Sequence, residues 1–229
     1  QGKLDAAVEA YKKALALKTD FVEAYSNMGN VLKEQGKLDA AVEAYKKALA
    51  LKPDFVEAYY NMGNALKEQG KLDAAKEAYK KALSLKPDYA KAYCNMGTIL
   101  LDQGKLDAAL EAYNQTLSLK PDFAEAYYNM GNALQEQGAM EKAIEAYNQA
   151  LSLKPDFAEV HNNMGTILQR QGKLEEAIEA YKKALFLKPD DAVAYNNMGN
   201  ALQDQGKTEE ALEVYKKALS LKPDYAEAY

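Results

Sequence analysis

The sequence predicts an all-α solenoid of stacked helix–turn–helix units, and three observations lead to this fold class. The prolines recur every 34 residues, and the glycines fall into two columns with the same spacing, a column being the set of residues at one position in successive units. Between these residues, apolar side chains follow helical spacing. A repeat of this period cannot bury its own apolar face, so neighbouring units must stack. The prolines are Pro53, Pro87, Pro121, Pro155, Pro189 and Pro223, and the glycine columns start at Gly2 and Gly29.

The first helix of each unit is visible in the segment 22–55. Small and apolar side chains recur there at helical spacing, and Gly36 then interrupts the pattern. Glycine adopts left-handed backbone conformations more readily than other residues, so a turn is expected at Gly36. The side chains of this stripe are Ala24, Tyr25, Met28, Val31 and Leu32.

The second helix follows this turn and ends before Pro53, which cannot continue a helix. Asp54 and Glu57 then form a predicted capping box for the next first helix. The same pair recurs as Asp20/Glu23, Asp122/Glu125, Asp156/Glu159 and Asp224/Glu227. The second-helix stripe consists of Leu38, Ala41, Val42, Tyr45, Ala48, Leu49 and Leu51.

The small residues have a predicted packing role. Gly29 and Ala41 allow the two helices of one unit to approach closely, and Ala48 is expected to admit a neighbouring helix. Tyr45 and its equivalents are expected to fill the space between the helices. Each fully buried large side chain of this kind contributes about 1.5–3 kcal/mol.

The pattern Tyr25-x-x-Met28-Gly29-x-x-Leu32, followed by Ala41-x-x-x-Tyr45, Ala48 and Pro53, resembles the tetratricopeptide-repeat signature. The resemblance covers the chain as a lone second helix (1–21), six repeats and a stub of the next repeat (226–229). It implies a right-handed superhelix whose first helices line a concave groove. The six repeats span 22–55, 56–89, 90–123, 124–157, 158–191 and 192–225.

Composition excludes several classes of protein. The net charge of −5 disfavours nucleic acid as a partner, because phosphate contacts need a basic surface. There is no apolar run of about 18 residues and no signal peptide, so no membrane association is expected. With one cysteine, Cys94, and one histidine, His161, no catalytic triad or metal site can be assembled. We therefore expect a cytoplasmic protein that is not an enzyme and needs no cofactor.

The candidate binding residues are polar columns of the first helices. One column is asparagine in every repeat, and a second column three residues on is asparagine or threonine, on the same helix face. An asparagine amide offers two donors and an acceptor, so it can bind the backbone of an extended peptide without reading its side chains. The first column is Asn27, Asn61, Asn95, Asn129, Asn163 and Asn197, and the second contains Asn30, Asn64, Asn132 and Asn200, with Thr98 and Thr166.

These columns are similar to the asparagine ladder in the tetratricopeptide arm of O-GlcNAc transferases, where asparagines hold extended polypeptide. Asparagine is also common at these positions in ordinary tetratricopeptide repeats, where it orders helices and water, and this alternative stays open. Tyr60 and Tyr128 are expected to point into the groove and contact ligand side chains. The charged columns of the groove sum to about −5, which favours neutral or basic segments.

The second helices carry a charge pattern on their outer side. A glutamate recurs once per repeat, as in Glu9 and Glu43, and a lysine usually follows four residues later, which predicts i,i+4 ion pairs. Several residues depart from their columns, among them His161, Phe186 and Asp191. His161 replaces tyrosine and is expected to pack in its place, while Phe186 and Asp191 indicate local repacking or a contact patch.

The function predicted from these features is a scaffold that binds extended or disordered protein segments. Two alternatives stay open: the substrate-recruiting arm of a larger enzyme such as a glycosyltransferase, and a structural or designed array without a ligand. Both chain ends resemble interrupted repeats, from which end-to-end stacking of copies is expected.

Overall fold

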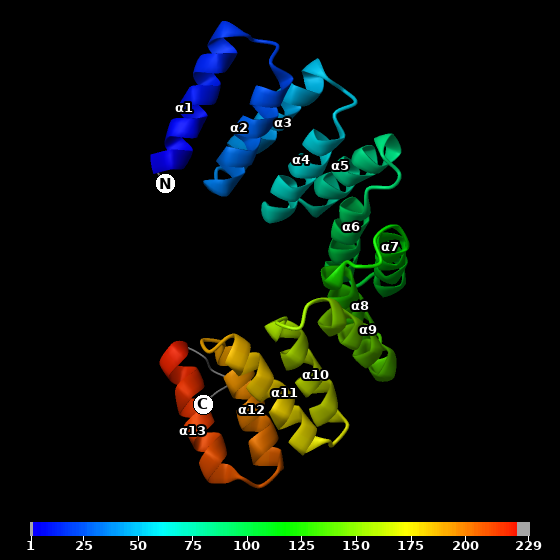
Figure 1. Cartoon of the computed structure of the whole chain (residues 1–229), viewed down its shortest axis with the longest axis vertical. Coiled ribbons are helices and arrows are strands. Elements are labelled where there is room, and N and C mark those ends of the chain that lie inside the picture. Colours follow the sequence, from blue (N-terminus) through cyan, green and yellow to red (C-terminus); the bar gives the residue numbers. More distant parts are fainter. Residues whose placement is uncertain (1, 224–229) are drawn as a thin grey trace. The chain divides into compact units, whose positions relative to one another are not determined.

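The computed structural model describes residues 2–223 and shows thirteen α-helices in that range, without strands (Figure 1). The predicted stub at 226–229 and the capping box at Asp224/Glu227 fall outside the described residues. The chain divides into two compact units, unit 1 (1–120) and unit 2 (121–229), each with its own core. Unit 1 contains α1 (Gly2–Leu17), α2 (Val22–Glu34), α3 (Leu38–Leu51), α4 (Val56–Glu68), α5 (Leu72–Leu85), α6 (Ala90–Asp102) and α7 (Leu106–Leu119). Unit 2 contains α8 (Ala124–Glu136), α9 (Met140–Leu153), α10 (Ala158–Arg170), α11 (Leu174–Leu187), α12 (Ala192–Asp204) and α13 (Thr208–Leu221).

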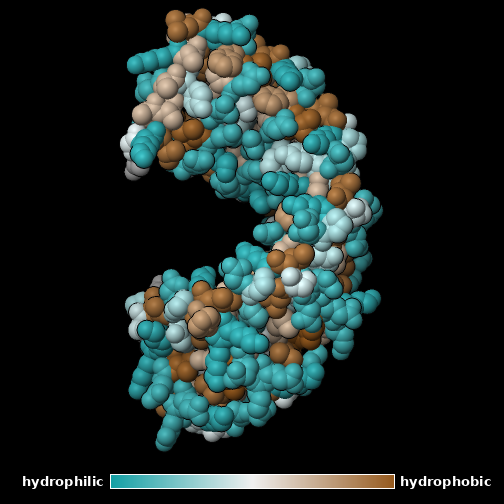
Figure 2. Space-filling model, viewed as in Figure 1, coloured by the Kyte–Doolittle hydropathy of each residue, from teal (hydrophilic) through white to brown (hydrophobic). Residues whose placement is uncertain are grey.

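Each unit is a solenoid of antiparallel helix pairs, which confirms the predicted all-α fold class. The first helices, such as α2 and α4, pack against the second helices, such as α3 and α5. The exposed side of the first helices is called here the first-helix face, and the exposed side of the second helices the second-helix face. In the view of Figure 2, hydrophilic side chains predominate on the surface of both units, with hydrophobic ones scattered among them.

The turn inside each helix pair is made by glycine in a left-handed conformation. Gly36 has a φ of 72°, a region that costs a residue with a Cβ atom. The Gly36 N–H donates to the Lys33 carbonyl at 2.8 Å, and the Lys37 N–H donates to the Leu32 carbonyl at 2.9 Å. This pair of bonds is the Schellman motif, which satisfies the last carbonyls of the helix.

The predicted capping boxes are wrong. The N-cap position of α4 is Phe55, one residue after Asp54, and no side chain caps this helix. Asp54 lies one position too early for its carboxylate to reach the N–H groups of the first turn. The Phe55 ring instead packs in an apolar cluster with Ala48 and Ala58, and Lys52 Nζ lies 5.3 Å from its centre. Aromatic packing therefore replaces hydrogen-bonded capping at this junction.

Asp191 is the exception to this rule among the helices that the structure describes with an N-cap residue. It occupies the N-cap position of α12, where other first helices have Phe or Tyr. Its Oδ1 atom accepts hydrogen bonds from Val193 N at 3.0 Å and Ala194 N at 3.2 Å. The departure at Asp191 thus exchanges an aromatic junction for a side-chain cap.

The core of each helix pair is a tyrosine facing a glycine, and this tyrosine is buried in every pair except α12 and α13, where Tyr215 is half-buried. Tyr79 is fully buried, and a Cβ atom added at Gly63 would lie 2.6 Å from Tyr79 Cε1. Only glycine leaves room for the ring, because real Cβ atoms do not approach carbon this closely. The predicted close approach is therefore correct, and it is an approach of α4 to the tyrosine ring of α5.

The charge pattern of the second helices forms different ion pairs from those predicted. Lys46 Nζ lies 2.8 Å from Glu43 Oε1, an i,i+3 pair, and not the expected i,i+4 partner. Glu9–Lys12, Glu77–Lys80 and Glu179–Lys182 repeat this geometry at 2.8 Å. These pairs are more than half exposed, so they contribute little to stability.

Candidate functional site

The asparagine columns lie on the first-helix face of both units. Asn27 is exposed, and the other members of both columns are half-buried. They come from the middle of the first helices, α2, α4 and α6 in unit 1 and α8, α10 and α12 in unit 2. Helical spacing of three residues places both columns on the same side of each helix.

In unit 1 the two columns are joined by hydrogen bonds between neighbouring helix pairs. Asn30 Oδ1 accepts from the Tyr45 hydroxyl at 2.7 Å and from Asn61 Nδ2 at 3.1 Å. Tyr45 belongs to the same helix pair as Asn30, and Asn61 belongs to the next. We call this three-residue arrangement an amide bridge.

The amide bridge is repeated one helix pair further along the chain. Asn64 Oδ1 accepts from the Tyr79 hydroxyl at 2.7 Å and from Asn95 Nδ2 at 2.8 Å. Asn95 Nδ2 also lies 3.3 Å from the hydroxyl oxygen of Tyr60. Each bridge therefore ties one second helix and two first helices together.

Unit 2 contains the same arrangement. Asn132 Oδ1 accepts from the Tyr147 hydroxyl at 2.7 Å and from Asn163 Nδ2 at 2.9 Å. The Tyr147 hydroxyl also lies 3.0 Å from Gln135 Oε1. The Tyr147 hydroxyl has one proton, so it donates to Asn132 or to Gln135 but not to both at once. If the Gln135 side-chain amide is flipped, the hydroxyl instead accepts a hydrogen bond from Gln135 Nε2.

Threonine in the second column changes the bridge. The Tyr181 hydroxyl donates to Thr166 Oγ1 at 3.3 Å, and the Thr166 hydroxyl donates to the Asn162 carbonyl at 3.2 Å. Asn197 Nδ2 then donates to Asn162 Oδ1 at 3.1 Å. The asparagine of the first column thus keeps a bond to the preceding helix pair by using a neighbouring amide.

The tyrosine hydroxyls of the bridges are proton donors at all physiological pH values. Burial raises the pKa of Tyr45 and Tyr79 well above the ordinary value near 10, because the charged tyrosinate would be desolvated. Sequence reasoning assigned these tyrosines only a space-filling role. The signal that it did not use is a tyrosine fifteen residues after each second-column asparagine.

The bridges leave part of each amide available. Asn61 donates one hydrogen bond from Nδ2, and Asn95 Nδ2 donates to Asn64 with Tyr60 and Tyr79 also within reach, while the Oδ1 atoms of both accept no hydrogen bond from the described part of the chain. Asn27 forms no side-chain hydrogen bond within that part of the chain, and it is exposed. The first-helix face can therefore still offer donors and acceptors to a ligand.

Tyr60 and Tyr128 lie at two equivalent positions on this face. Both are half-buried. The Tyr60 ring centre lies 4.9 Å from that of Tyr89, and the Tyr128 ring centre lies 4.9 Å from that of Phe157. Part of each ring is therefore used in packing, and the remaining surface is exposed beside the amide bridges.

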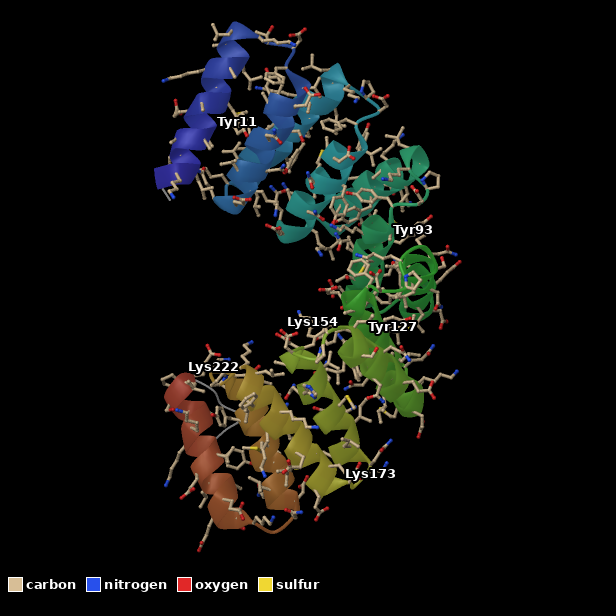
Figure 3. All side chains as sticks on the ribbon, in the orientation of Figure 1. Tyr11, Tyr93, Tyr127, Lys154, Lys173 and Lys222 are labelled. Carbon is tan, nitrogen blue, oxygen red and sulfur yellow. The ribbon has the colours of Figure 1, made fainter. Side chains whose placement is uncertain are left out.

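A lysine closes each of these aromatic clusters. Lys86 Nζ lies 5.4 Å from the Tyr89 ring centre. In unit 2, Lys154, which lies where α9 ends (Figure 3), has its Nζ 4.4 Å from the Phe157 ring centre. Such cation–π contacts stabilise the junction between successive helix pairs. Burial also raises the pKa of Tyr89 to about 12.

The first-helix face is net acidic in each unit. In unit 1 the charged columns give a net charge of −2, from Glu23, Glu34, Glu57, Glu68 and Asp102 against Lys33, Lys67 and Lys91. In unit 2 they give −3, from Glu125, Glu136, Glu159 and Asp204 against Arg170. The ion pair of Lys33 with Glu68, at 3.2 Å, joins two neighbouring first helices. In unit 2, Gln169 Nε2 donates to Asp204 at 2.7 Å.

Two further properties of the described residues bear on function. No group of three or more His, Cys, Asp or Glu side chains there has a geometry that could hold a metal ion. None of the described helices is long and apolar enough to cross a lipid bilayer.

Comparisons with known proteins give consistent results. Residues 55–229 match the family model described as the cilia and flagella-associated protein 70 C-terminal domain, a tetratricopeptide-repeat model. Residues 1–36 and 29–70 match the model described as TPR repeat. Among curated protein sequences, none matches this chain.

Several solved structures have the same fold. MamA is 31% identical, with a TM-score of 0.64 over 71% of this chain and 95% of MamA. YrrB, described as a TPR protein with an unusual peptide-binding site, is 26% identical, with a TM-score of 0.63 over 82% of this chain and 96% of YrrB. The structure of the APC/C hetero-tetramer Cut9–Hcn1 is 19% identical, with a TM-score of 0.83 over 99% of this chain and 45% of that chain. Together with the 34-residue helix pairs and the family models, these similarities show that the chain belongs to the tetratricopeptide-repeat family.

Proposed function

We propose that this protein is a non-catalytic scaffold that binds extended segments of other proteins on its first-helix face. The observation that supports this proposal most is the row of asparagine amides. Neighbouring helix pairs present them side by side, and each bridge fixes their orientation while leaving hydrogen-bonding atoms unused. An amide held in this way is pre-organised to bind a peptide backbone.

The energies of hydrogen bonding support a broad specificity. A net hydrogen bond contributes about 0.5–1.5 kcal/mol, and ordering a disordered segment costs about 2–5 kcal/mol or more. Binding through amides alone is therefore weak and insensitive to sequence. Additional affinity is expected from the exposed surfaces of Tyr60 and Tyr128 and from the acidic surroundings, which favour neutral to basic segments.

The similarity to YrrB supports peptide binding as a property of this kind of array, because that protein is described as having a peptide-binding site. A single cysteine, Cys94, fits a reducing compartment such as the cytoplasm, which we include in the proposal. We also propose that residues 22–225 form six complete repeats and that copies of the chain stack end to end.

The proposal is tested with unstructured synthetic peptides that are matched in length and carry net positive, zero or net negative charge. Binding is measured by fluorescence anisotropy for the wild type and for the triple variant Asn27→Ala/Asn61→Ala/Asn95→Ala. We expect the wild type to bind positive and neutral peptides better than negative ones. The triple variant is expected to bind more weakly, because three of the six first-column amides are removed.

The control must separate lost contacts from a loosened fold. Tyr79→Phe removes a hydrogen bond from the bridge at Asn64 and leaves every exposed amide in place. If Tyr79→Phe retains peptide affinity while the triple variant loses it, the amides themselves bind the peptide. Equal affinity of the triple variant and the wild type would show that the first-column amides of unit 1 do not bind the peptide.

A further inference from the structure

Two departures from the repeat pattern meet at one place on the second-helix face of unit 2. His161 stands where other repeats have tyrosine, and Phe186 stands where they have serine or alanine. They occupy opposite ends of two successive helices: His161 lies near the start of α10, and Phe186 lies at the end of α11. Both line a single cavity of about 450 Å³, together with Pro155, Lys182, Lys183 and Leu187.

The fold does not use Phe186. Its side chain is 85% exposed, whereas the serine or alanine of the other repeats presents little apolar surface at this position. Leu187 beside it is also exposed, at 36%. An exposed phenylalanine next to a cavity is a surface that gains free energy when a partner covers it. The predicted local repacking around Phe186 is therefore not found.

The cavity continues along α11. A neighbouring cavity of about 460 Å³ shares His161 and Lys183, and it is lined further on by Met164, Leu168 and Glu176. Unit 1 has a corresponding cavity of about 510 Å³ between α3 and α5, lined by Tyr59, Met62, Leu66 and Lys81 at the equivalent positions. The groove is thus a recurring feature of the second-helix face, and His161 and Phe186 modify its end in unit 2.

The substitution at His161 also removes the ring that a lysine contacts in one repeat of unit 1. In unit 1, Lys47 Nζ lies 5.8 Å from the Tyr25 ring centre, and Lys183 and His161 occupy the same two positions in unit 2. Lys182 is paired with Glu179 at 2.8 Å, but Lys183 forms no ion pair with the described residues. Burial lowers the pKa of His161, and the nearby Lys183 charge adds to this effect, while a hydrogen bond with the Pro155 backbone acts in the opposite direction. The cavity is therefore lined by two lysine ammonium groups, of which Glu179 pairs with Lys182 and attracts Lys183 only over a longer distance.

We propose that this cavity, which we call the His161–Phe186 site, binds an acidic segment of a partner protein. An apolar side chain of the segment enters between His161, Phe186 and Leu187, and an adjacent carboxylate pairs with Lys183. Further along the groove the wall carries Glu175 and Glu176, and Glu179 lies between these two carboxylates and the lysines. This gradient of charge orients the segment, with its carboxylate toward the end of α11.

A nucleic acid fits the same cavity less well. Aromatic and lysine side chains together are typical of single-strand binding, but a strand needs a positively charged path for successive phosphates. The three glutamates that line the adjoining cavity would repel the next phosphates along such a strand. An acidic peptide needs only one carboxylate near Lys183.

The test starts from a random-peptide display selection against the full chain, with counter-selection against Phe186→Ser. This variant and His161→Tyr restore the residues of other repeats, so both are expected to fold, which a thermal melt checks. Enriched peptides are expected to contain an aromatic or leucine residue beside Asp or Glu. Their affinity, measured by anisotropy, is expected to fall about tenfold in Phe186→Ser and in Lys183→Glu, the loss of one anchoring contact.

A matched gain of function strengthens the test. Tyr59→His/Ser84→Phe introduces the same pair into unit 1, where Lys81 and Leu85 occupy the positions of Lys183 and Leu187. This variant is expected to bind two peptides per chain. The Asn27/Asn61/Asn95 triple variant is expected to bind the enriched peptides as the wild type does, which separates this site from the first-helix face.

Three outcomes would overturn the proposal. One is an enrichment of basic peptides, or of none at all. Another is a single-stranded oligonucleotide that binds the wild type and not Phe186→Ser. The third is self-association in sedimentation experiments that Phe186→Ser abolishes, because the exposed phenylalanine would then contact a second copy of the chain.

Discussion

At the scale of single residues, the asparagines of the first helices hold the stacked helix pairs together. Asn30 and Asn64 each accept two hydrogen bonds, one from a buried tyrosine and one from the next helix pair. Such a bond is worth more where water is excluded, and an unpaired buried hydroxyl would be costly. This role explains why asparagine, a mediocre helix former, occurs in the middle of these helices.

The glycine that faces each buried tyrosine gives a prediction at this scale. Gly63→Ala is expected to destabilise the protein by about 1–3 kcal/mol, the usual cost of overpacking, because its Cβ atom would lie 2.6 Å from Tyr79 Cε1. Urea unfolding followed by circular dichroism measures this change. The reference is a double-mutant cycle with Tyr79→Leu, in which removal of the ring should abolish the cost of alanine. A Gly63→Ala protein as stable as the wild type would contradict this account of the packing.

At the scale of the helices, the junctions between repeats differ in how the next helix begins. In α4 and α10, Phe55 and Phe157 occupy the N-cap position and pack under a lysine, without a hydrogen-bonded cap. In α12, Asp191 caps the helix with its carboxylate. The sequence predicts Asp54 as the N-cap of α4, one residue before the observed N-cap, Phe55. The prediction is wrong because one residue separates the end of the Lys-Pro-Asp loop from the first helical residue, Val56.

Asp191→Ala is expected to lower the stability of unit 2 by about 0.5–2 kcal/mol, the usual cost of losing an N-cap. Asp191→Asn keeps a side-chain oxygen at the same place, so it should restore most of the loss. Thermal melting of both variants beside the wild type provides the measurement. If Asn and Ala were equally destabilising, the effect would come from the charge of Asp191, which also lies 3.6 Å from Lys188 Nζ, and not from capping.

At the scale of the whole molecule, the buried tyrosines predict sensitivity to alkaline pH. Burial raises the pKa of Tyr45, Tyr79 and Tyr147, so the native state keeps these protons at pH values where the unfolded chain loses them. The stability is fully present below the unfolded pKa of about 10 and is lost progressively as the pH rises above it. Urea unfolding free energies between neutral pH and about pH 11 are therefore expected to decline steeply at the upper end.

The control for this prediction is Tyr45→Phe, which removes one titrating group and should reduce the slope of stability against pH. Tyrosine absorbance recorded in parallel reports whether ionisation accompanies unfolding. A free energy of unfolding that stays constant across this range would show that the hydroxyls are not protected from solvent.

The sequence alone determined the helical fold class, the turns and most of the buried positions. Helix periodicity, the left-handed preference of glycine and the limits that proline sets act over a few residues, and a 34-residue spacing repeats them. A column such as Tyr45 could therefore be assigned to the core, and Gly36 to a turn, without knowledge of the packing. The identity of the candidate binding columns was visible for the same reason.

Only the tertiary structure decided which polar atoms form hydrogen bonds within the fold and which stay available to a ligand. Asn30 and Asn61 are 31 residues apart, and whether their amides meet depends on how two helices pack, to within a fraction of an ångström. The same holds for His161 and Phe186, which share a cavity because the end of α11 lies beside the start of α10. Local spacing fixes the face on which a side chain lies, whereas hydrogen bonds and cavities depend on the separation and tilt of neighbouring helices.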